Sequence, residues 1–186
     1  MKLRLAVSFC LVIIFASTSL GQKPPAIEAS LGYSFLRERP TFNRHGWVAS
    51  AAGNVNSWFG AKGEIGGNYT DIVHHDAHSF LAGAQFSARR NPTVTPWSHF
   101  LLGVVRTGQG ARLVNFQDVI FGGPPVFLPV TRSDFAIQPG GGVDLWLQPT
   151  LGIRLGGDYR RRFGLPFVDR NSFRLQLGIV FRTPTK

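Results

Sequence analysis

The sequence predicts an all-β chain that closes into an eight-stranded antiparallel up-and-down transmembrane β-barrel. Three observations lead to this prediction. Eight runs of residues alternate between apolar and polar side chains, as strands with one apolar face do. The single cysteine, Cys10, lies in a leader segment, so the exported domain must be stabilised by something other than a disulfide. After Gln22 no apolar run is long enough to cross a bilayer as a helix, which leaves strands to do so.

Residues 1–21 have the features of a secretory signal peptide. Lys2 and Arg4 form a short basic region, residues 5–16 form an apolar core, and residues 16–21 are mostly small, with cleavage expected after Gly21. Residues 22–186 are then long enough for one domain and too short for two. We expect this single domain to be the barrel.

The eight runs follow one another along the whole exported part of the chain. They cover residues 27–36, 46–56, 58–69, 79–89, 96–108, 135–147, 151–161 and 173–182. The last run shows the alternation best, with Phe173, Leu175, Leu177, Ile179 and Phe181 on one face. An even strand number allows up-and-down closure, in which the last strand pairs with the first.

The links between the runs alternate in length. The links after the second, fourth and sixth runs are short, whereas those at about 37–45, 70–78, 109–133 and 161–170 are longer and richer in charge, proline and glycine. Short turns at one end and long loops at the other are typical of a membrane barrel. In the sixth run, Pro139 and Gly140–Gly142 predict a bulge or a bend.

Alternation alone does not show which face points inward. The export signal favours a membrane barrel over a soluble ligand-binding barrel, so we expect the polar face to line a lumen that side chains fill. Arg174 and Arg182 are expected to meet acids such as Glu28 and Glu64. The charged residues assigned to the lumen are Glu28, Lys62, Glu64, Asp144, Arg154, Asp158, Arg160, Arg174, Arg182 and Arg106.

The fifth run is ambiguous because both of its faces carry apolar residues. Arg106 favours an inner face made of even-numbered residues, which places His99 on the outside. Aromatic residues near the strand ends are expected to form girdles at the two membrane interfaces. They are Phe35, Trp47, Trp58, Tyr69, Phe80, Trp97, Trp146, Tyr159, Phe173 and Phe181.

Several segments resemble the small outer-membrane β-barrel proteins of Gram-negative bacteria, which are OmpA-like in architecture. These segments are residues 32–37 (GYSFLR), residues 140–144 (GGGVD), Asp158-Tyr159 and residues 175–181 (LQLGIVF). The resemblance spans essentially all of residues 22–186, which it identifies as an outer-membrane barrel domain without a periplasmic domain. It implies a place in the outer membrane and contact with its lipid and surface glycolipid. It also implies insertion by the barrel-assembly machinery, although residues 182–186 follow the aromatic Phe181 on which such chains often end.

The formal net charge of +10 falls to +8 without Lys2 and Arg4. A basic chain can bind nucleic acid or anionic lipid. Here the arginines are spread over strands and loops without a nucleic-acid motif, so we expect no nucleic-acid partner. We also expect the barrel to be a monomer. Arg160–Arg162 stand at the edge of a strand and a loop, where they could meet glycolipid phosphates or form an ordinary charged rim.

Two groups of residues suggest chemistry. Asp71, His74, His75, Asp76 and His78 could hold zinc or copper, but a solvated polar loop is the more frequent role of such a segment. We therefore expect no metal, no cofactor and no cofactor-binding residue.

The pair His78-Ser79 together with His99 suggests a lipid-directed esterase. No nucleophile-elbow motif accompanies them, so we expect no catalytic residues and no enzyme activity. The expected function is a structural or surface-interaction role with long extracellular loops. A narrow porin-like channel for small solutes is the alternative, and a lipid-directed enzyme is less favoured.

Overall fold

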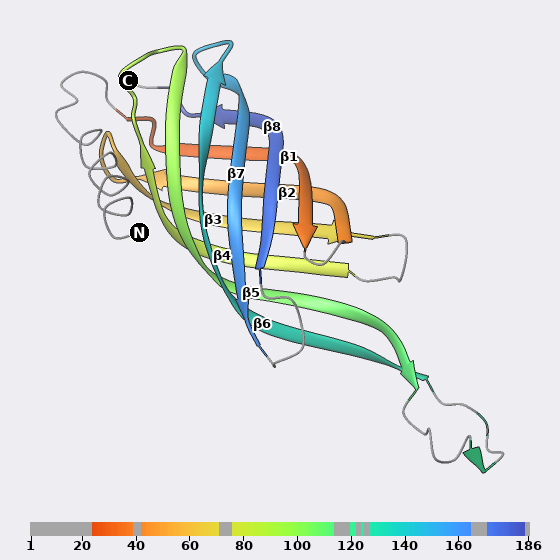
Figure 1. The fold of residues 1–186 in the computed structure, drawn as a ribbon. Helices are drawn as coiled ribbons and strands as arrows, with labels where there is room; N and C mark the ends of the chain where they lie inside the picture. Colours follow the sequence, from red (N-terminus) through yellow and green to blue (C-terminus); the bar gives the residue numbers. More distant parts are fainter. Residues whose placement is uncertain are drawn as a thin grey trace, which may run out of the picture.

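The computed structural model describes residues 24–38, 42–70, 76–113, 120–121, 124, 127–164 and 171–184. Each of the eight alternating runs folds as a strand. The strands are β1 (Ile27–Glu38), β2 (Phe42–Asn54), β3 (Phe59–Tyr69), β4 (Asp76–Ser87), β5 (Val94–Leu113), β6 (Phe127–Trp146), β7 (Leu151–Phe163) and β8 (Asn171–Arg182). Each strand pairs antiparallel with the next, and the sheet closes into a barrel (Figure 1). The predicted fold class is confirmed.

The barrel closes where β8 pairs with β1, as predicted. The register runs from Glu28 opposite Arg182 to Glu38 opposite Ser172. The backbone N–H of Thr183 donates to the carbonyl of Ile27 at 3.0 Å, so both ends of the barrel chain meet at the end that carries the short turns. The expected signal peptide, residues 1–21, lies outside the described residues. In the part of the chain that the structure describes, no helix is long and apolar enough to span a membrane.

The register around the barrel determines its width. A path perpendicular to the strands starts at Trp97 on β5, passes through all eight strands and returns to β5 at Thr107, ten residues further along. Its in-register residues are Trp97, Gly142, Gly156, Gln176, Ser34, Gly46, Asn68, Ala77 and Thr107. This shift requires the strands to tilt by roughly 35–45°. An eight-stranded barrel of this kind has an interior just wide enough for side chains.

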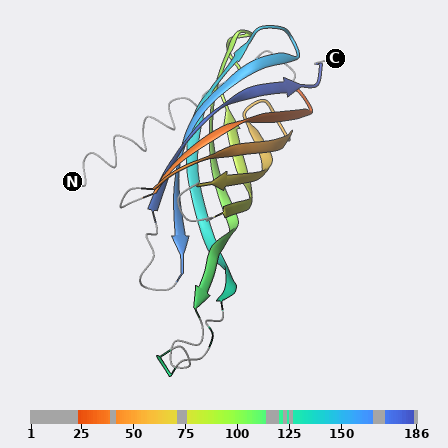
Figure 2. The same cartoon turned by 90° about the vertical axis from the view of Figure 1, so that its right-hand side faces the viewer.

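The strands β5 and β6 are longer than the sequence predicts. Residues 109–113 and 127–133 of the link expected at 109–133 continue these two strands, each of which has 20 residues. The hairpin runs well beyond the other six strands (Figures 1 and 2). The only register shift in the β5–β6 ladder lies between Gln109 and Ala111, where the hairpin leaves the barrel. By contrast, β6 keeps its register with both neighbours on either side of Pro139, so of the predicted bulge or bend the bulge is wrong. The pairing with β7 is interrupted there, since Gln138 and Pro139 have no partner in that ladder.

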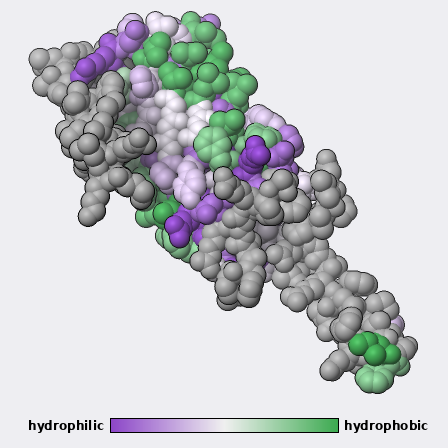
Figure 3. All heavy atoms as spheres, in the orientation of Figure 1, coloured by the Kyte–Doolittle hydropathy of each residue, from purple (hydrophilic) through white to green (hydrophobic). Residues whose placement is uncertain are grey.

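The outer wall of the barrel is apolar. Large side chains on every strand point outward and are about half exposed, for example Leu31 at 61% and Phe80 at 57%. On β8 the five alternating residues from Phe173 to Phe181 are each between 50% and 52% exposed. Figure 3 shows apolar side chains of this kind gathered on the barrel wall. The polar face therefore points into the lumen, as the membrane-barrel interpretation predicts.

Candidate functional site

The most distinctive chemistry of the barrel lies in its lumen, which is densely charged. Arg160 and Arg174 are among the largest fully buried side chains. Eight of the ten charged residues predicted to line the lumen are buried there, namely Glu28, Lys62, Glu64, Asp144, Arg154, Asp158, Arg160 and Arg174. Arg182 is half-buried at the mouth, where Nε donates to the Pro149 carbonyl at 2.6 Å and the guanidinium lies 3.8 Å from the centre of the Trp146 ring. Arg106 is exposed on the outer wall, so its assignment to the lumen is wrong.

At the turn end, Arg154 forms the centre of a first charge cluster. Its Nε and Nη2 donate to the two oxygens of Asp144, each at 2.7 Å. Glu28 lies 3.7 Å from the same guanidinium and 2.7 Å from Arg89. Two cations, Lys62 and Arg154, each lie 5.0 Å from the centre of the Trp97 ring, and its Nε1 donates to Asp144 at 2.9 Å. Each buried charge in this cluster thus has an opposite charge beside it.

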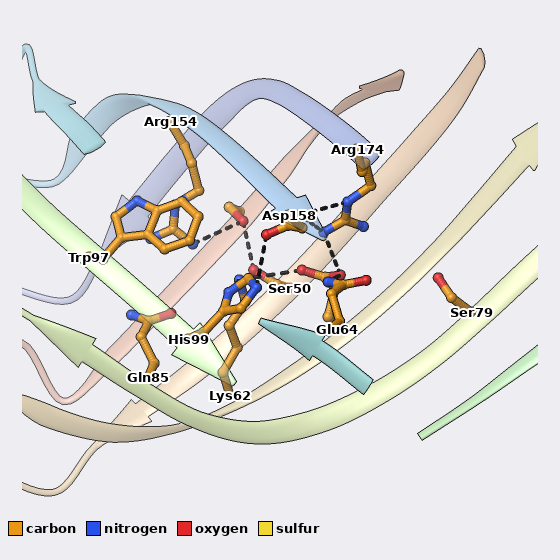
Figure 4. Close-up of polar contacts among 12 residues, drawn as sticks. Ser50, Lys62, Glu64, Ser79, Gln85, Trp97, His99, Arg154, Asp158 and Arg174 are labelled. Atoms are coloured by element: carbon orange, nitrogen blue, oxygen red, sulfur yellow. Dashed lines mark hydrogen bonds and ion pairs between the residues drawn. The ribbon is translucent and has the colours of Figure 1, made fainter. Parts of the chain in front are cut away.

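A second cluster occupies the middle of the lumen, with Arg174 at its centre (Figure 4). The Arg174 guanidinium binds Asp158 through Nε at 2.8 Å and lies 2.7 Å from Glu64. Glu64 lies 3.3 Å from the ammonium of Lys62 and accepts a hydrogen bond from Gln138 at 2.9 Å. These contacts link β3, β6, β7 and β8 across the lumen, and they confirm the predicted pairing of Arg174 with Glu64.

His99 belongs to this middle cluster, although the sequence places it outside. Lys62 donates to Nδ1 at 3.1 Å, and Nε2 lies 2.9 Å from Asp158. The prediction is wrong because the inner face of β5 is formed by odd-numbered residues, two of which, Leu101 and Val105, are apolar. They belong to an apolar group inside the lumen with Ala77, Leu81 and Ala136. Because this inner face is partly apolar, β5 lacks the alternation of polar and apolar residues that shows which side chains point inward.

A third cluster lies at the loop end and was not predicted from the sequence. Glu38 accepts from Arg44 and Arg162, each at 3.0 Å, and Arg162 also donates to Thr107 at 3.3 Å. The sequence carries a signal for this cluster, since Glu38 and Arg44 share the parity of Glu28 and Ser50 on their strands. Both residues lie in the link predicted at 37–45, and this prediction is wrong over most of its length because β1 runs to Glu38 and β2 begins at Phe42.

Glycines in β6 and β7 make room for the large lumen residues. A Cβ at Gly142 would lie 2.7 Å from the Trp97 ring, and one at Gly156 would lie 2.8 Å from it. A Cβ at Gly140 would lie 1.9 Å from Asp158. The triple glycine of β6 is therefore a packing surface, and it allows the clusters to fill the lumen.

The outward aromatic residues only partly match the predicted girdles. Trp47, Trp58, Tyr69, Phe80, Tyr159, Phe173 and Phe181 are exposed on the outer wall, and Phe35 is half-exposed. Trp97 and Trp146 are instead 4% and 6% exposed and lie in the lumen, where Nε1 of Trp146 donates to Thr95 at 3.0 Å. These two tryptophans were assigned by their place near strand ends, which does not distinguish the two faces.

Of the residues suggested for catalysis, Ser79 lies away from His99 (Figure 4). His78 is on the outer face of β4 with its ring edge-on to Tyr69, and Asp71, His74 and His75 lie outside the described residues. Ser79 is buried and accepts from Arg160 at 3.4 Å, whereas His99 contacts Lys62 and Asp158. The metal hypothesis stays untested.

Fold and lumen together define an eight-stranded transmembrane β-barrel with an apolar outer wall and a plugged, charged interior. No model of a protein family matches the chain, and no curated protein matches it. Among solved structures it is similar to Neisserial surface protein A, with a TM-score of 0.63 and 14% identity over 84% of this chain and 95% of the other. It is also similar to Ail, the attachment invasion locus protein of Yersinia pestis (TM-score 0.54, 16% identity, 88% and 99% covered).

A third similar structure is the outer membrane protein OprG from Pseudomonas aeruginosa, with a TM-score of 0.56 and 8% identity over 89% of this chain and 99% of the other. At such identities the likeness concerns the fold. The chain has the fold of the small outer-membrane barrels, as the sequence resemblance predicts.

Proposed function

We propose that the chain is an integral outer-membrane protein, exported by residues 1–21, that presents a binding surface outside the cell. The closed barrel satisfies the backbone hydrogen bonds of its strands within the sheet, which lipid demands of any spanning structure. Its apolar outer wall suits contact with the acyl chains of a bilayer, and its charged residues lie in the lumen, away from lipid. Two proteins with this fold are named for a surface location and for attachment, which supports the same role here.

The observation that carries this proposal is the long β5–β6 hairpin. The ladder to β4 ends with Gly108 opposite Asp76, and the ladder to β7 ends with Phe135 opposite Phe163. Beyond these positions, in the part of the chain that the structure describes, the two strands pair only with each other. A ribbon of this kind has backbone donors and acceptors along its edges, to which an extended segment of a partner can add as a further strand.

Cysteine labelling tests the orientation, because residues 22–186 contain no cysteine. We expect Thr131→Cys, exposed on the hairpin, to react with a membrane-impermeant maleimide in intact cells. Asn91→Cys, exposed in the short turn between β4 and β5, should react only after lysis. The reverse pattern would contradict the proposed orientation, and equal labelling of both in the soluble fraction would contradict the membrane location.

Removing the hairpin tests the binding role. A variant in which a short turn replaces residues 109–130 should keep the heat-modifiable gel mobility of a folded barrel, because the ladders that close the barrel end at Gly108 and Phe135. Attachment of the producing cells to a eukaryotic cell layer should fall relative to cells with the full chain. Unchanged attachment by the hairpin variant would refute the role of the hairpin.

The filled lumen supports a role other than conduction or catalysis. Arg174 and Leu101 are both 0% exposed, and the buried Trp97 ring has two cations, each 5.0 Å from its centre. We therefore expect no discrete channel events in planar bilayers and no change of lipid A mass on expression of the protein. Either signal would favour the channel or the enzyme over the surface role.

A further inference from the structure

Arg160 on β7 is a buried cation that belongs to none of the three charge clusters. Its side chain is 1% exposed and points into the lumen, between Asp158 of the middle cluster and Arg162 of the third cluster, each two residues away on the same face of β7. Within the stretch Arg160–Arg162, Arg161 faces outward and is exposed. The guanidinium of Arg160 thus lies inside the barrel, where a charge without an opposite charge beside it is costly.

The hydrogen-bond acceptors of Arg160 are neutral. Its Nε donates to Oε1 of Gln138 at 2.8 Å, and its Nη2 donates to the hydroxyl oxygen of Ser79 at 3.4 Å. The Gln138 amide is held in this orientation by Glu64, to which its Nε2 donates at 2.9 Å. Among the residues that the structure describes, no carboxylate forms an ion pair with Arg160. These contacts position the guanidinium but leave its charge in place.

The two carboxylates of the middle cluster, Glu64 and Asp158, are bound by other cations. Arg174 contacts both of them, and the ammonium of Lys62 lies 3.3 Å from Glu64. Two cations and two carboxylates balance one another in this cluster. The charge of Arg160 is therefore in excess of this balance.

His99 does not change this balance. The ammonium of Lys62 has no acceptor, so it donates to Nδ1 of His99, at 3.1 Å. The ring proton is then on Nε2, which lies 2.9 Å from Asp158. The imidazole is neutral in this arrangement, so the middle of the lumen carries one uncompensated positive charge once Arg160 is included.

Arg160 and Ser79 also carry donors that have no acceptor in the described part of the chain. A guanidinium has five N–H groups, and the hydrogen bonds to Gln138 and Ser79 use two of those of Arg160. Ser79 is 1% exposed and accepts from Arg160, so its own hydroxyl hydrogen is available to donate. Buried donors are normally matched by an acceptor. A water molecule would accept these hydrogen bonds but would leave the charge uncompensated, whereas an anion does both.

We propose that the barrel binds a small inorganic anion in its lumen, held by the guanidinium of Arg160 on β7 and the hydroxyl of Ser79 on β4. A halide such as chloride suits the site better than sulfate or phosphate, because the interior of an eight-stranded barrel is filled by side chains and the surrounding Gln138 and Arg174 are both 0% exposed. The bound anion supplies the negative charge that the middle cluster lacks. The inference rests on the closed barrel and is independent of the proposed surface role.

The first test is urea unfolding in phosphatidylcholine vesicles, with chloride replaced stepwise by gluconate at constant ionic strength. Screening is then the same at every step, whereas the occupancy of a halide site changes. Above the dissociation constant, a tenfold rise in chloride should raise the folding equilibrium constant about tenfold, because one ion binds the folded barrel. Arg160→Gln should abolish this dependence, since it removes the charge and keeps a side chain that forms hydrogen bonds.

The matched control is Arg154→Gln, which removes a lumen arginine from the cluster at the turn end. It should lower the stability at every chloride concentration, because Asp144 loses both of its hydrogen bonds from Arg154, and it should keep the chloride dependence of the unaltered barrel. Ser79→Ala is a second, milder variant. It should raise the chloride concentration needed for the same stabilisation about tenfold, as expected for the loss of one hydrogen bond to a charged group. Heat-modifiable mobility shows that each variant is folded.

Crystals of the barrel grown in bromide locate the ion directly. We expect an anomalous peak within hydrogen-bonding distance of the Arg160 guanidinium and the Ser79 hydroxyl, and no such peak in Arg160→Gln. A stability that does not respond to chloride would overturn the inference, as would an equal response in Arg160→Gln or a bromide peak elsewhere in the lumen. A peak at Arg160 without any chloride effect on stability would mean an adventitious ion only.

Discussion

Arg174 holds two carboxylates in the middle of the lumen, which makes its replacement the most informative stability experiment. In Arg174→Met, Glu64 keeps Lys62 at 3.3 Å, but Asp158 keeps only the imidazole of His99 at 2.9 Å. One buried carboxylate then lacks a full opposite charge. Breaking a buried ion pair on one side costs about 3–5 kcal/mol, so we expect the free energy of unfolding to fall by about that amount.

The assay is urea unfolding in phosphatidylcholine vesicles, followed by tryptophan fluorescence and by heat-modifiable mobility. The double variant Arg174→Met, Asp158→Asn should be more stable than the single variant, because the amide removes the uncompensated charge. Arg106→Met is the control on the outer wall and should change the free energy of unfolding by no more than about 0.5 kcal/mol in vesicles without anionic lipid.

A loss below about 1 kcal/mol in Arg174→Met would refute this reasoning, because that is the range of exposed ion pairs. It would mean that water reaches the middle cluster and screens its charges. A loss in the double variant equal to the sum of the two single losses would also contradict it, since contacting residues are expected to couple.

Two further predictions concern packing and facing. Gly142→Ala should destabilise the barrel by about 1–3 kcal/mol, because its Cβ would lie 2.0 Å from the Leu155 carbonyl oxygen and 2.7 Å from Trp97. Gly63→Ala is the control: its Cβ would have nothing within 4 Å, so the urea midpoint should stay unchanged. In single-tryptophan variants, brominated lipid should quench the fluorescence of Trp58, which is 49% exposed on the outer wall, and should leave that of Trp97 unquenched. The opposite result would mean that the inner and outer faces are assigned the wrong way round.

The strands that the sequence predicts best are those whose lumen face is charged. On β7 and β8 the lumen positions Arg154 and Arg174 each stand between two large apolar residues in the sequence. On β5 the inner row contains the apolar Leu101 and the outer row contains the charged Arg106, so polarity no longer distinguishes the inner face from the outer face.

The clusters depend on information that alternation does not carry. Whether a side chain points inward follows from its odd or even position on one strand. Which residues meet across the lumen depends instead on the shift of ten residues around the barrel. That shift brings Arg174 of β8 level with Glu64 of β3. The extent of β5 and β6 was missed for a related reason, since Pro129 and the surrounding glycines are usual in loops but are tolerated in a hairpin whose edges are open.

The ten-residue shift limits how this protein can change in evolution. Strand number and shift together set the radius, so longer loops leave the width of the interior as it is. A wider passage would require a duplicated hairpin, which adds two strands at once and preserves the even number. Within the present radius, a larger lumen side chain needs a smaller one opposite, as Trp97 opposite Gly142 illustrates. We therefore expect lumen residues to change in evolution as compensating pairs of substitutions. The outer part of the β5–β6 hairpin can lengthen or shorten without a compensating change in the barrel.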